Sequence, residues 1–311
     1  MYRSQNRGIM AGILAGVFWG TPFLVPMVLA NFSGLEITFG RFFFFGLISL
    51  LSLPKLIRVM QSLTIREMLQ IIILSATGFW LYSLILFMGV RESDGIIASL
   101  IIGSLPVTVT LFSRPNFNRR LILGLILIIF GLACLLVYPL VFKANLASLS
   151  QVSLRGIILL LIALVMWSWF ALANSRFMAT HTHIRSLDYS SLIGVVSLIF
   201  ILPIFVLSHH GTSLLIHPEL VKFILWSMVL GFGASWLANI FWAYTAKNCP
   251  PSIGGALIIS ETIFGLVYSF IFSKKRSKVF DVLKFGYVLK FKLVLKFKRV
   301  LKFVVCKLLV V

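Results

Sequence analysis

One acidic residue, Glu261, lies near the middle of a strongly apolar run, 258-IISETIFG-265. An unpaired carboxylate is costly at membrane depth, so an acidic residue there is a functional-site hypothesis by default. Protonation would relieve the desolvation cost, and such a group suits a proton, a cation or a cationic solute. The alternative is an internal pair with a basic residue on another helix. We take Glu261 as the candidate ion- or substrate-coupling residue.

A basic residue and several aromatic or amide residues also lie within apolar runs. Arg41, in 39-FGRFFFF-45, is about two turns inside its run, so its long side chain either anchors at the membrane interface or belongs to the site. Trp19, Pro22, Phe23 and Pro26 share a helical face and form either an aromatic packing patch or a cavity wall. The predicted wall residues of a solute cavity are Trp19, Tyr82, Trp236 and Asn239.

Other chemistries find little support in the sequence. All five histidines fall in expected loops, which gives no cluster within the membrane for a metalloenzyme. The chain has no Gly-Lys dipeptide and hence no Walker A phosphate loop. Its three cysteines are isolated and define neither a metal site nor a disulfide framework. We therefore expect no enzymatic activity, no cofactor and no metal site.

The elements that must position these residues are membrane spans. The chain is 60% hydrophobic, well above the roughly 50% that is usual in soluble domains. Runs of about twenty apolar residues are long enough to cross the hydrocarbon core as helices. The first run is read as a retained span rather than a cleaved signal peptide, because it is long and others follow. Nine spans are predicted, at 9–30, 35–54, 68–90, 95–113, 119–139, 153–174, 187–208, 222–244 and 252–272.

The distribution of basic residues predicts the orientation of these spans. If the N-terminus is inside, eleven Lys and Arg residues up to residue 272 fall on the inner side and four on the outer side. Short cytoplasmic loops collect Lys and Arg. We expect a multi-pass protein of the inner cell membrane with a cytoplasmic N-terminus.

The spans also suggest an internal repeat. The run 17-VFWG-20 corresponds to 165-VMWS-168 at an offset of 148, and 80-WL-81 corresponds to 236-WL-237 at an offset of 156. The change of offset is what an insertion in one loop would produce. A repeat of five spans is odd-numbered, so the second copy would enter the membrane from the opposite side. This pattern divides the chain into a first repeat at 1–139, a second repeat at 153–272 and a tail at 273–311.

Several of these runs carry a family resemblance. The run 13-ILAGVFWGTPFLVPMVLANFSGLEITFGRFF-43 resembles the opening of an EamA-type drug/metabolite transporter, and the likeness continues through 98-ASLIIGSLP-106 and 256-ALIISETIFG-265. The resemblance implies ten helices in two inverted five-helix repeats that carry small organic solutes. Family-like positions are Trp19, Arg41, Pro106 and Glu261. The chain departs from the family at Thr262, where a proline is often found, and in having no convincing tenth helix.

We therefore expect an all-helical secondary transporter that works by alternating access. Spans one, three, four, six, eight and nine would surround its central cavity. The expected partners are a small-molecule solute, the lipid bilayer and a coupling ion, a proton or sodium; no nucleic acid is expected, and the oligomeric state is left open. The alternative is a non-transporting membrane component or a truncated relic of such a transporter.

The tail departs from this pattern. Residues 273–311 carry 12 of the 28 basic residues and repeat VLKF four times with a six-residue period. Scattered lysines make a central membrane span expensive. A lipid- or nucleic-acid-binding tail is one interpretation. We favour the other, a replacement of the tenth helix by a frameshift or a recombined coding end.

Overall fold

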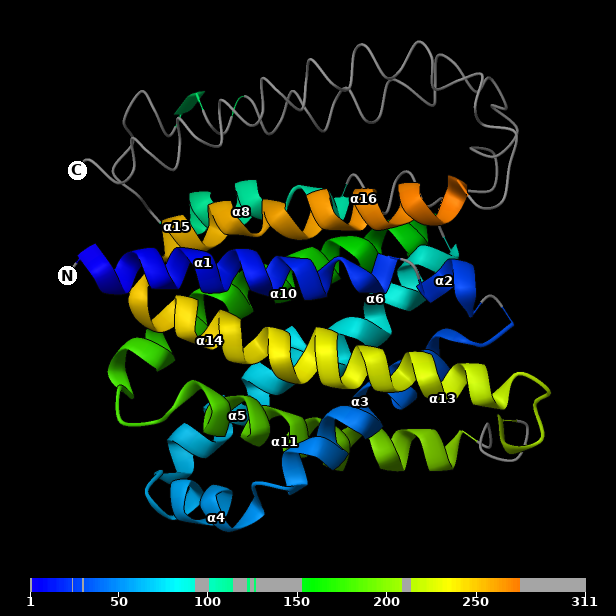
Figure 1. Cartoon of the computed structure of the whole chain (residues 1–311), viewed down its shortest axis with the longest axis horizontal. Helices are drawn as coiled ribbons and strands as arrows, with labels where there is room; N and C mark the ends of the chain where they lie inside the picture. The colour runs from blue at the N-terminus through cyan, green and yellow to red at the C-terminus, as the bar shows by residue number, and fades with distance from the viewer. Residues whose placement is uncertain are drawn as a thin grey trace.

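The chain is described by a computed structural model that covers residues 2–23, 25–29, 31–92, 101–113, 122–123, 126, 153–208 and 214–274. In these ranges it is a bundle of helices, most of them running along the long axis of the molecule, and it contains no strand (Figure 1). The all-helical fold class predicted from the sequence is confirmed for this part of the chain.

The helices of the two sequence halves have the following bounds. In the first half they are α1 Tyr2–Trp19, η1 Thr21–Phe23, α2 Val25–Val28, α3 Gly34–Leu50, α4 Leu53–Gln61, α5 Ile65–Gly78, α6 Trp80–Glu92 and α8 Leu105–Phe112. In the second half they are α10 Leu154–Thr180, α11 Ser186–Leu207, α13 Leu220–Met228, η3 Val229–Leu237, α14 Ala238–Asn248, α15 Pro251–Leu257 and α16 Ile259–Lys274.

Four stretches are long and apolar enough to cross a membrane, among the residues that the structure describes. They are Ile65–Gly89, Leu154–Thr180, Ser186–Leu207 and Leu220–Asn248. A fifth arises if α3 and α4, which meet at an 84° bend, form one span. Several of the nine predicted spans correspond to these stretches within a few residues, whereas span 119–139 falls almost wholly outside the described residues.

The first predicted span is broken at its prolines. Helix α1 ends at Trp19, a short 3₁₀ turn covers Thr21–Phe23, and α2 resumes at Val25. Pro22 has no N–H group and frees the carbonyl of Phe18, four residues earlier. The hydroxyl of Thr21 donates to that carbonyl at 2.7 Å. The freed backbone group is therefore satisfied within the span.

Other spans are interrupted as well. Residue Phe79 separates α5 from α6 with a non-helical backbone (φ −130°, ψ −97°). The middle of span 220–248 is a π-helix, η3, whose hydrogen bonds run from residue i to i+5. A turn at Ile258 separates α15 from α16. Irregular backbone at membrane depth is tolerated where it is buried in protein or lines a cavity.

The glycines of the first predicted span form a packing seam. A Cβ at Gly12 would lie 2.7 Å from the side chain of Leu257, and one at Gly20 would lie 2.7 Å from the backbone nitrogen of Gly265. The seam continues at Gly8 and Gly16, against Asn248 and Ser260. Small residues let the backbones of α1 and α16 approach closely.

Candidate functional site

Three tryptophans from three helices meet near the centre of the bundle. The ring centroids of Trp19 and Trp242 are 5.2 Å apart, those of Trp19 and Trp167 are 5.8 Å apart, and those of Trp167 and Trp242 are 5.9 Å apart. Each side chain is at most 7% exposed. Large aromatic side chains contribute much buried apolar area and hold specific ring geometries. We call Trp19, Trp167 and Trp242 the tryptophan cluster.

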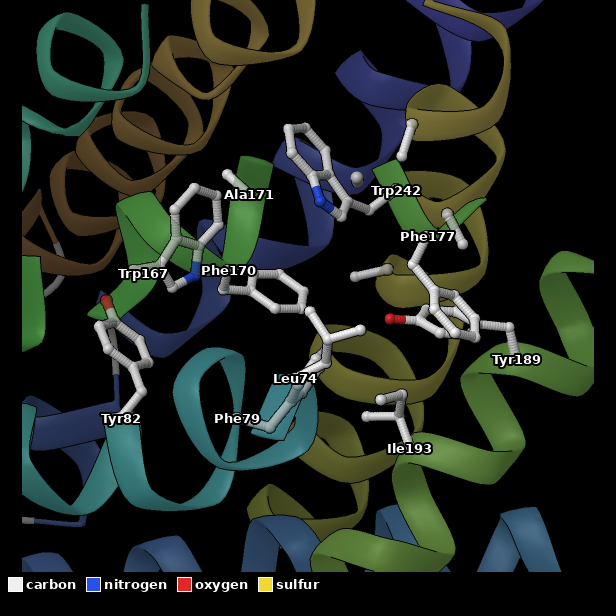
Figure 2. Close-up of a cluster of buried hydrophobic side chains, with 14 of the residues drawn as sticks. Leu74, Phe79, Tyr82, Trp167, Phe170, Ala171, Phe177, Tyr189, Ile193 and Trp242 are labelled. Atoms are coloured by element: carbon white, nitrogen blue, oxygen red, sulfur yellow. The ribbon is translucent and has the colours of Figure 1, made fainter. Parts of the chain in front are cut away.

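An aromatic path leads away from the tryptophan cluster. Figure 2 shows Phe170 beside Trp167, with Phe79 and Leu74 further along. The rings of Phe79 and Phe170 meet edge to face at 5.4 Å. A narrow pocket beside Trp242, lined by Ala171, Thr245 and Cys249 among others, has a free volume of about 10 Å³. This is room for about one water molecule and far too little for an organic solute.

Arg41 is held against the π-helix. Its Nε donates to the Ser235 hydroxyl at 2.8 Å, and a terminal nitrogen donates to the Ala234 carbonyl at 3.3 Å. Both acceptors lie in η3. Single π-helical turns are frequent at functional sites. These bonds hold the side chain against a neighbouring helix, and a role for Arg41 in the site stays a prediction.

Glu261 lies in the first turn of α16, directly after the turn at Ile258. Its backbone nitrogen donates to the Ile258 carbonyl at 3.0 Å. The carboxylate is half-buried and lies within electrostatic range of the Arg41 guanidinium and the Tyr82 hydroxyl. None of the ion pairs within 4.0 Å in the described residues joins it to Arg41. The acid and the base therefore interact across a gap rather than as a closed pair, and such an interaction is strong where water is excluded.

Tyr82 joins this group to the tryptophan cluster. It is buried in the same hydrophobic core as Trp19 and Trp167. Figure 2 shows its hydroxyl directed toward Trp167. The structure thus brings four of the candidates, Trp19, Arg41, Tyr82 and Glu261, from α1, α3, α6 and α16 to one region of the bundle.

The other two candidates lie on span 220–248. Trp236 packs against α11, because its indole N–H donates to the Ser191 hydroxyl at 3.0 Å and its carbonyl accepts from Ser190 at 2.8 Å. Asn239 is completely buried, and neither atom of its amide has a hydrogen-bond partner in the protein. An unsatisfied buried amide costs about 1–3 kcal/mol, so its presence requires an explanation.

Two further polar groups are buried without a hydrogen-bond partner. The amide nitrogen of Asn174 and the indole nitrogen of Trp242 are also buried without a partner, although the Asn174 oxygen accepts from the Tyr189 hydroxyl at 2.6 Å. Asn239 and Trp242 are three residues apart on α14, which places them on one side of that helix. The Trp242 indole N–H, within the tryptophan cluster, and the Asn239 amide, on the same side of α14, are therefore donors without an acceptor.

Sequence reasoning did not name Trp167 or Ser235 as site residues. For Trp167 a signal existed, since the repeat match at offset 148 pairs it with Trp19. For Ser235 there was none, because its contact with Arg41 depends on the π-helix.

Comparisons with known proteins agree with the membrane architecture. Residues 6–137 match the family model described as "EamA-like transporter family". The chain is 26% identical over 288 residues to the inner membrane protein YtfF of Escherichia coli (strain K12), which covers 85% of this chain and 87% of the relative. A crystal structure of another protein has a TM-score of 0.61 with 16% identity and covers 85% of this chain and 90% of that one, which indicates a shared fold.

These matches and the apolar helices place the protein in the inner membrane as a multi-pass protein. They also confirm the resemblance stated from the sequence. Residues 6–137 thus match the EamA-like transporter family, and over most of its length the chain is similar to an inner membrane protein.

Proposed function

We propose that the chain is a secondary transporter that moves a small organic solute across the inner membrane by alternating access. The observation that carries this proposal is the group formed by Glu261, Arg41 and Tyr82 next to the tryptophan cluster. It combines a carboxylate at membrane depth, a basic partner without direct contact, and large aromatic walls.

The proposed inverted repeat finds support in contacts between equivalent residues. Residues related by a two-fold axis meet each other only where they lie near that axis. Trp19 and Trp167, which the repeat pairs, have ring centroids 5.8 Å apart. The same offset of 148 pairs Gly46 of α3 with Gly194 of α11. A Cβ at Gly46 would clash with Leu198 of α11, and one at Gly194 would clash with Phe45 of α3. Transporter sites commonly lie between such repeats, near the membrane midplane.

The carboxylate of Glu261 supplies the proposed coupling. The ionised carboxylate attracts a proton, a sodium ion or a cationic solute, and the nearby Arg41 guanidinium competes with these cations for the carboxylate. Binding of a cation would shift this balance and change how strongly α16 and α3 attract each other. A coupling ion can drive a conformational change only if it binds the two conformations with different affinity.

The walls suit a solute with both apolar and polar parts. Tryptophan faces attract organic cations and stack on planar groups. The unpartnered amide of Asn239 offers both donors and an acceptor, so it suits a carboxylate, amide or hydroxyl on the solute. The solute would enter when the tryptophan cluster separates, because the narrow pocket beside Trp242 does not hold it.

Flux into proteoliposomes tests the proposal. A panel of radiolabelled amino acids, nucleosides and quaternary amines is first screened by thermal shift of the purified protein, and the hits are then measured as uptake with and without proton or sodium gradients. Uptake of at least one solute is expected. No uptake of any hit, in correctly inserted protein, would favour the alternative of a non-transporting membrane component or relic.

Glu261→Gln is expected to abolish or uncouple this uptake while leaving membrane insertion intact, since removing a charge eases insertion. The matched control is Glu92→Gln at the end of α6, where the carboxylate pairs with the exposed Arg155 at 3.5 Å. Normal uptake by a well-inserted Glu261→Gln variant would return Glu261 to a structural role.

A further inference from the structure

Each sequence half packs its first span against the third span of the other half. We define two exchanged pairs. The first exchanged pair is α1, η1 and α2 with α13, η3 and α14. The second exchanged pair is α10 with α5 and α6. Both pairs are antiparallel and have contacts along their full length, as the following distances show.

The first exchanged pair is joined at both ends and in the middle. Near the N-terminus of α1, the Thr245 hydroxyl donates to the Gly8 carbonyl at 2.8 Å. Further along, the rings of Phe18 and Phe241 stack with centroids 6.1 Å apart. At the opposite end, the Asn31 amide donates to the Glu219 carboxylate at 3.0 Å.

The second exchanged pair has the same three-point attachment. The His181 ring Nε2 lies 2.7 Å from the Glu67 carboxylate at one end. In the middle, the ring of Phe170 fills the space beside Gly78, where a Cβ would lie 2.5 Å from it. At the other end, the Ser153 N–H donates to the Glu92 carbonyl at 3.1 Å.

For the first exchanged pair, Figure 1 shows α1 beside α14, with the N-terminus of α1 and the end of α14 on the left.

The end contacts of the two pairs correspond to each other. Glu67 and Glu219 each stand at the start of the third span of a half. His181 and Asn31 each follow the first span of the opposite half. One contact therefore lies at each end of the bundle, as an inverted repeat would place them. Glu67 serves twice, because its other carboxylate oxygen caps α5 by accepting from the Thr64 N–H at 2.7 Å.

The seam between the two exchanged pairs is less extensively packed than either pair. The tryptophan cluster crosses it, with Trp19 and Trp242 on one side and Trp167 on the other. The hydroxyl of Ser175 donates weakly across it to the Ala246 carbonyl, at 3.4 Å. The Lys247 ammonium crosses it at one end and donates to the carbonyls of Thr182 and, at 3.2 Å, Ile184. The narrow pocket beside Trp242 also opens on this seam.

We propose that the rigid units that move against each other are the two exchanged pairs and not the two sequence halves. This inference rests on the proposed function and specifies its moving parts. The contacts Glu67–His181 and Asn31–Glu219 stay closed throughout the cycle, whereas the contact of Lys247 with Thr182 opens. The solute then binds on the seam, with Trp19, Trp242 and Glu261 on one wall and Trp167 and Tyr82 on the other.

Two cross-links at the same end of the bundle distinguish this proposal from the alternative in which the two sequence halves move as rigid units. Both are made in full-length protein whose three cysteines are replaced by serine, with a bifunctional thiol reagent that a reductant cleaves. The first joins Glu67→Cys to His181→Cys, across halves but within one exchanged pair. The second joins Thr182→Cys to Lys247→Cys, within one half but across the seam.

The probe is whichever panel member the cysteine-free protein takes up into proteoliposomes. The first cross-link is expected to leave uptake unchanged, and the second to abolish it until reductant is added. Each variant before cross-linking controls for the substitutions themselves. Loss of uptake with the first cross-link, or normal uptake with the second, would overturn the proposal and leave the transport function standing.

Distances between spin labels provide a readout that needs no solute. Labels on Asn6→Cys and Arg66→Cys share a half but lie on different exchanged pairs. Labels on Asn6→Cys and Val221→Cys lie in different halves but on one exchanged pair. In lipid nanodiscs, the first distance distribution is expected to be broader than the second. If the two distance distributions are equally wide, or the second is broader, the proposal is overturned, even in protein that shows no uptake. If the first distribution is broader but the protein shows no uptake, the transport function alone is rejected.

Discussion

Replacing Gly16 with alanine is expected to destabilise the protein, because α1 and α16 pack tightly at this point. A Cβ at Gly16 would lie 2.7 Å from the Cβ of Ser260 and 2.9 Å from the backbone nitrogen of Glu261. Real Cβ atoms do not approach other atoms so closely, and the backbone at Glu261 cannot turn aside as a flexible side chain would. The two helices must separate.

The size of the effect follows from two opposing contributions. Overpacking a tight contact costs about 1–3 kcal/mol. Alanine in a helix is favoured over glycine by about 1 kcal/mol. Since backbone is involved, we take the upper part of the first range and expect the free energy of unfolding to fall by about 1–2 kcal/mol.

Reversible unfolding in mixed micelles measures this change, and two further variants calibrate it. Gly254→Ala is the matched control, because a Cβ there would lie 3.7 Å from Trp242 in ordinary contact. Gly16→Ala combined with Ser260→Gly removes the side-chain part of the clash and should recover part of the loss. The reasoning is refuted if Gly16→Ala is as stable as Gly254→Ala, or if Ser260→Gly gives no recovery in the double variant.

Three further predictions follow from charge and sequence. Reporter fusions at Met1 and at the loops around Arg58, Arg119, Arg185 and Lys247 should behave as cytoplasmic; a periplasmic result near Arg119 with a cytoplasmic one near Lys143 would reverse the orientation. Deleting 277–311 should not reduce uptake, and restoring a tenth apolar helix should raise it; loss of uptake in normally inserted truncated protein would make the tail a working part. Hydrogen bonds from Lys222 and then Asn31 lower the pKa of Glu219 below its ordinary value of 4.5. The stability from these bonds is therefore present above the unfolded pKa and lost as the pH falls through the folded one. Thermal melts below about pH 4.5 should fall more steeply for the wild type than for Glu219→Gln; identical profiles would contradict this.

Several of the spans were predictable because apolar run length determines them. The predicted 187–208 corresponds to α11, Ser186–Leu207, and Pro22 accounts for the break in the first span. The interruptions at Phe79 and in η3 were not, since no proline stands there and the packing of neighbouring helices decides the backbone. The local sequence does not show how neighbouring helices pack against these residues.

Single residues of the candidate site could be named from the sequence, but their arrangement could not. A carboxylate within an apolar run is visible in any sequence, so Glu261 could be named from the desolvation cost alone. Its relation to Arg41 and Tyr82 could not, because three spans far apart in the chain bring them together. Trp167 could have been named through the proposed repeat, which pairs it with Trp19, the residue whose ring it contacts.

The π-helix η3 also affects how the two halves should be aligned. In the proposed repeat, α5 and α13 begin equivalent spans at Ile65 and Leu220, 155 residues apart, whereas Trp80 and Trp236 further along those spans are 156 residues apart. One extra residue therefore enters within the second of these spans, where η3 occupies Val229–Leu237, while the rest of the change of offset lies before it. Because a π turn takes up more residues than an α turn, the helix accommodates this residue without moving its ends. Alignments of such repeats that allow gaps only between helices would assign wrong counterparts to Ser235 and to the residues around it.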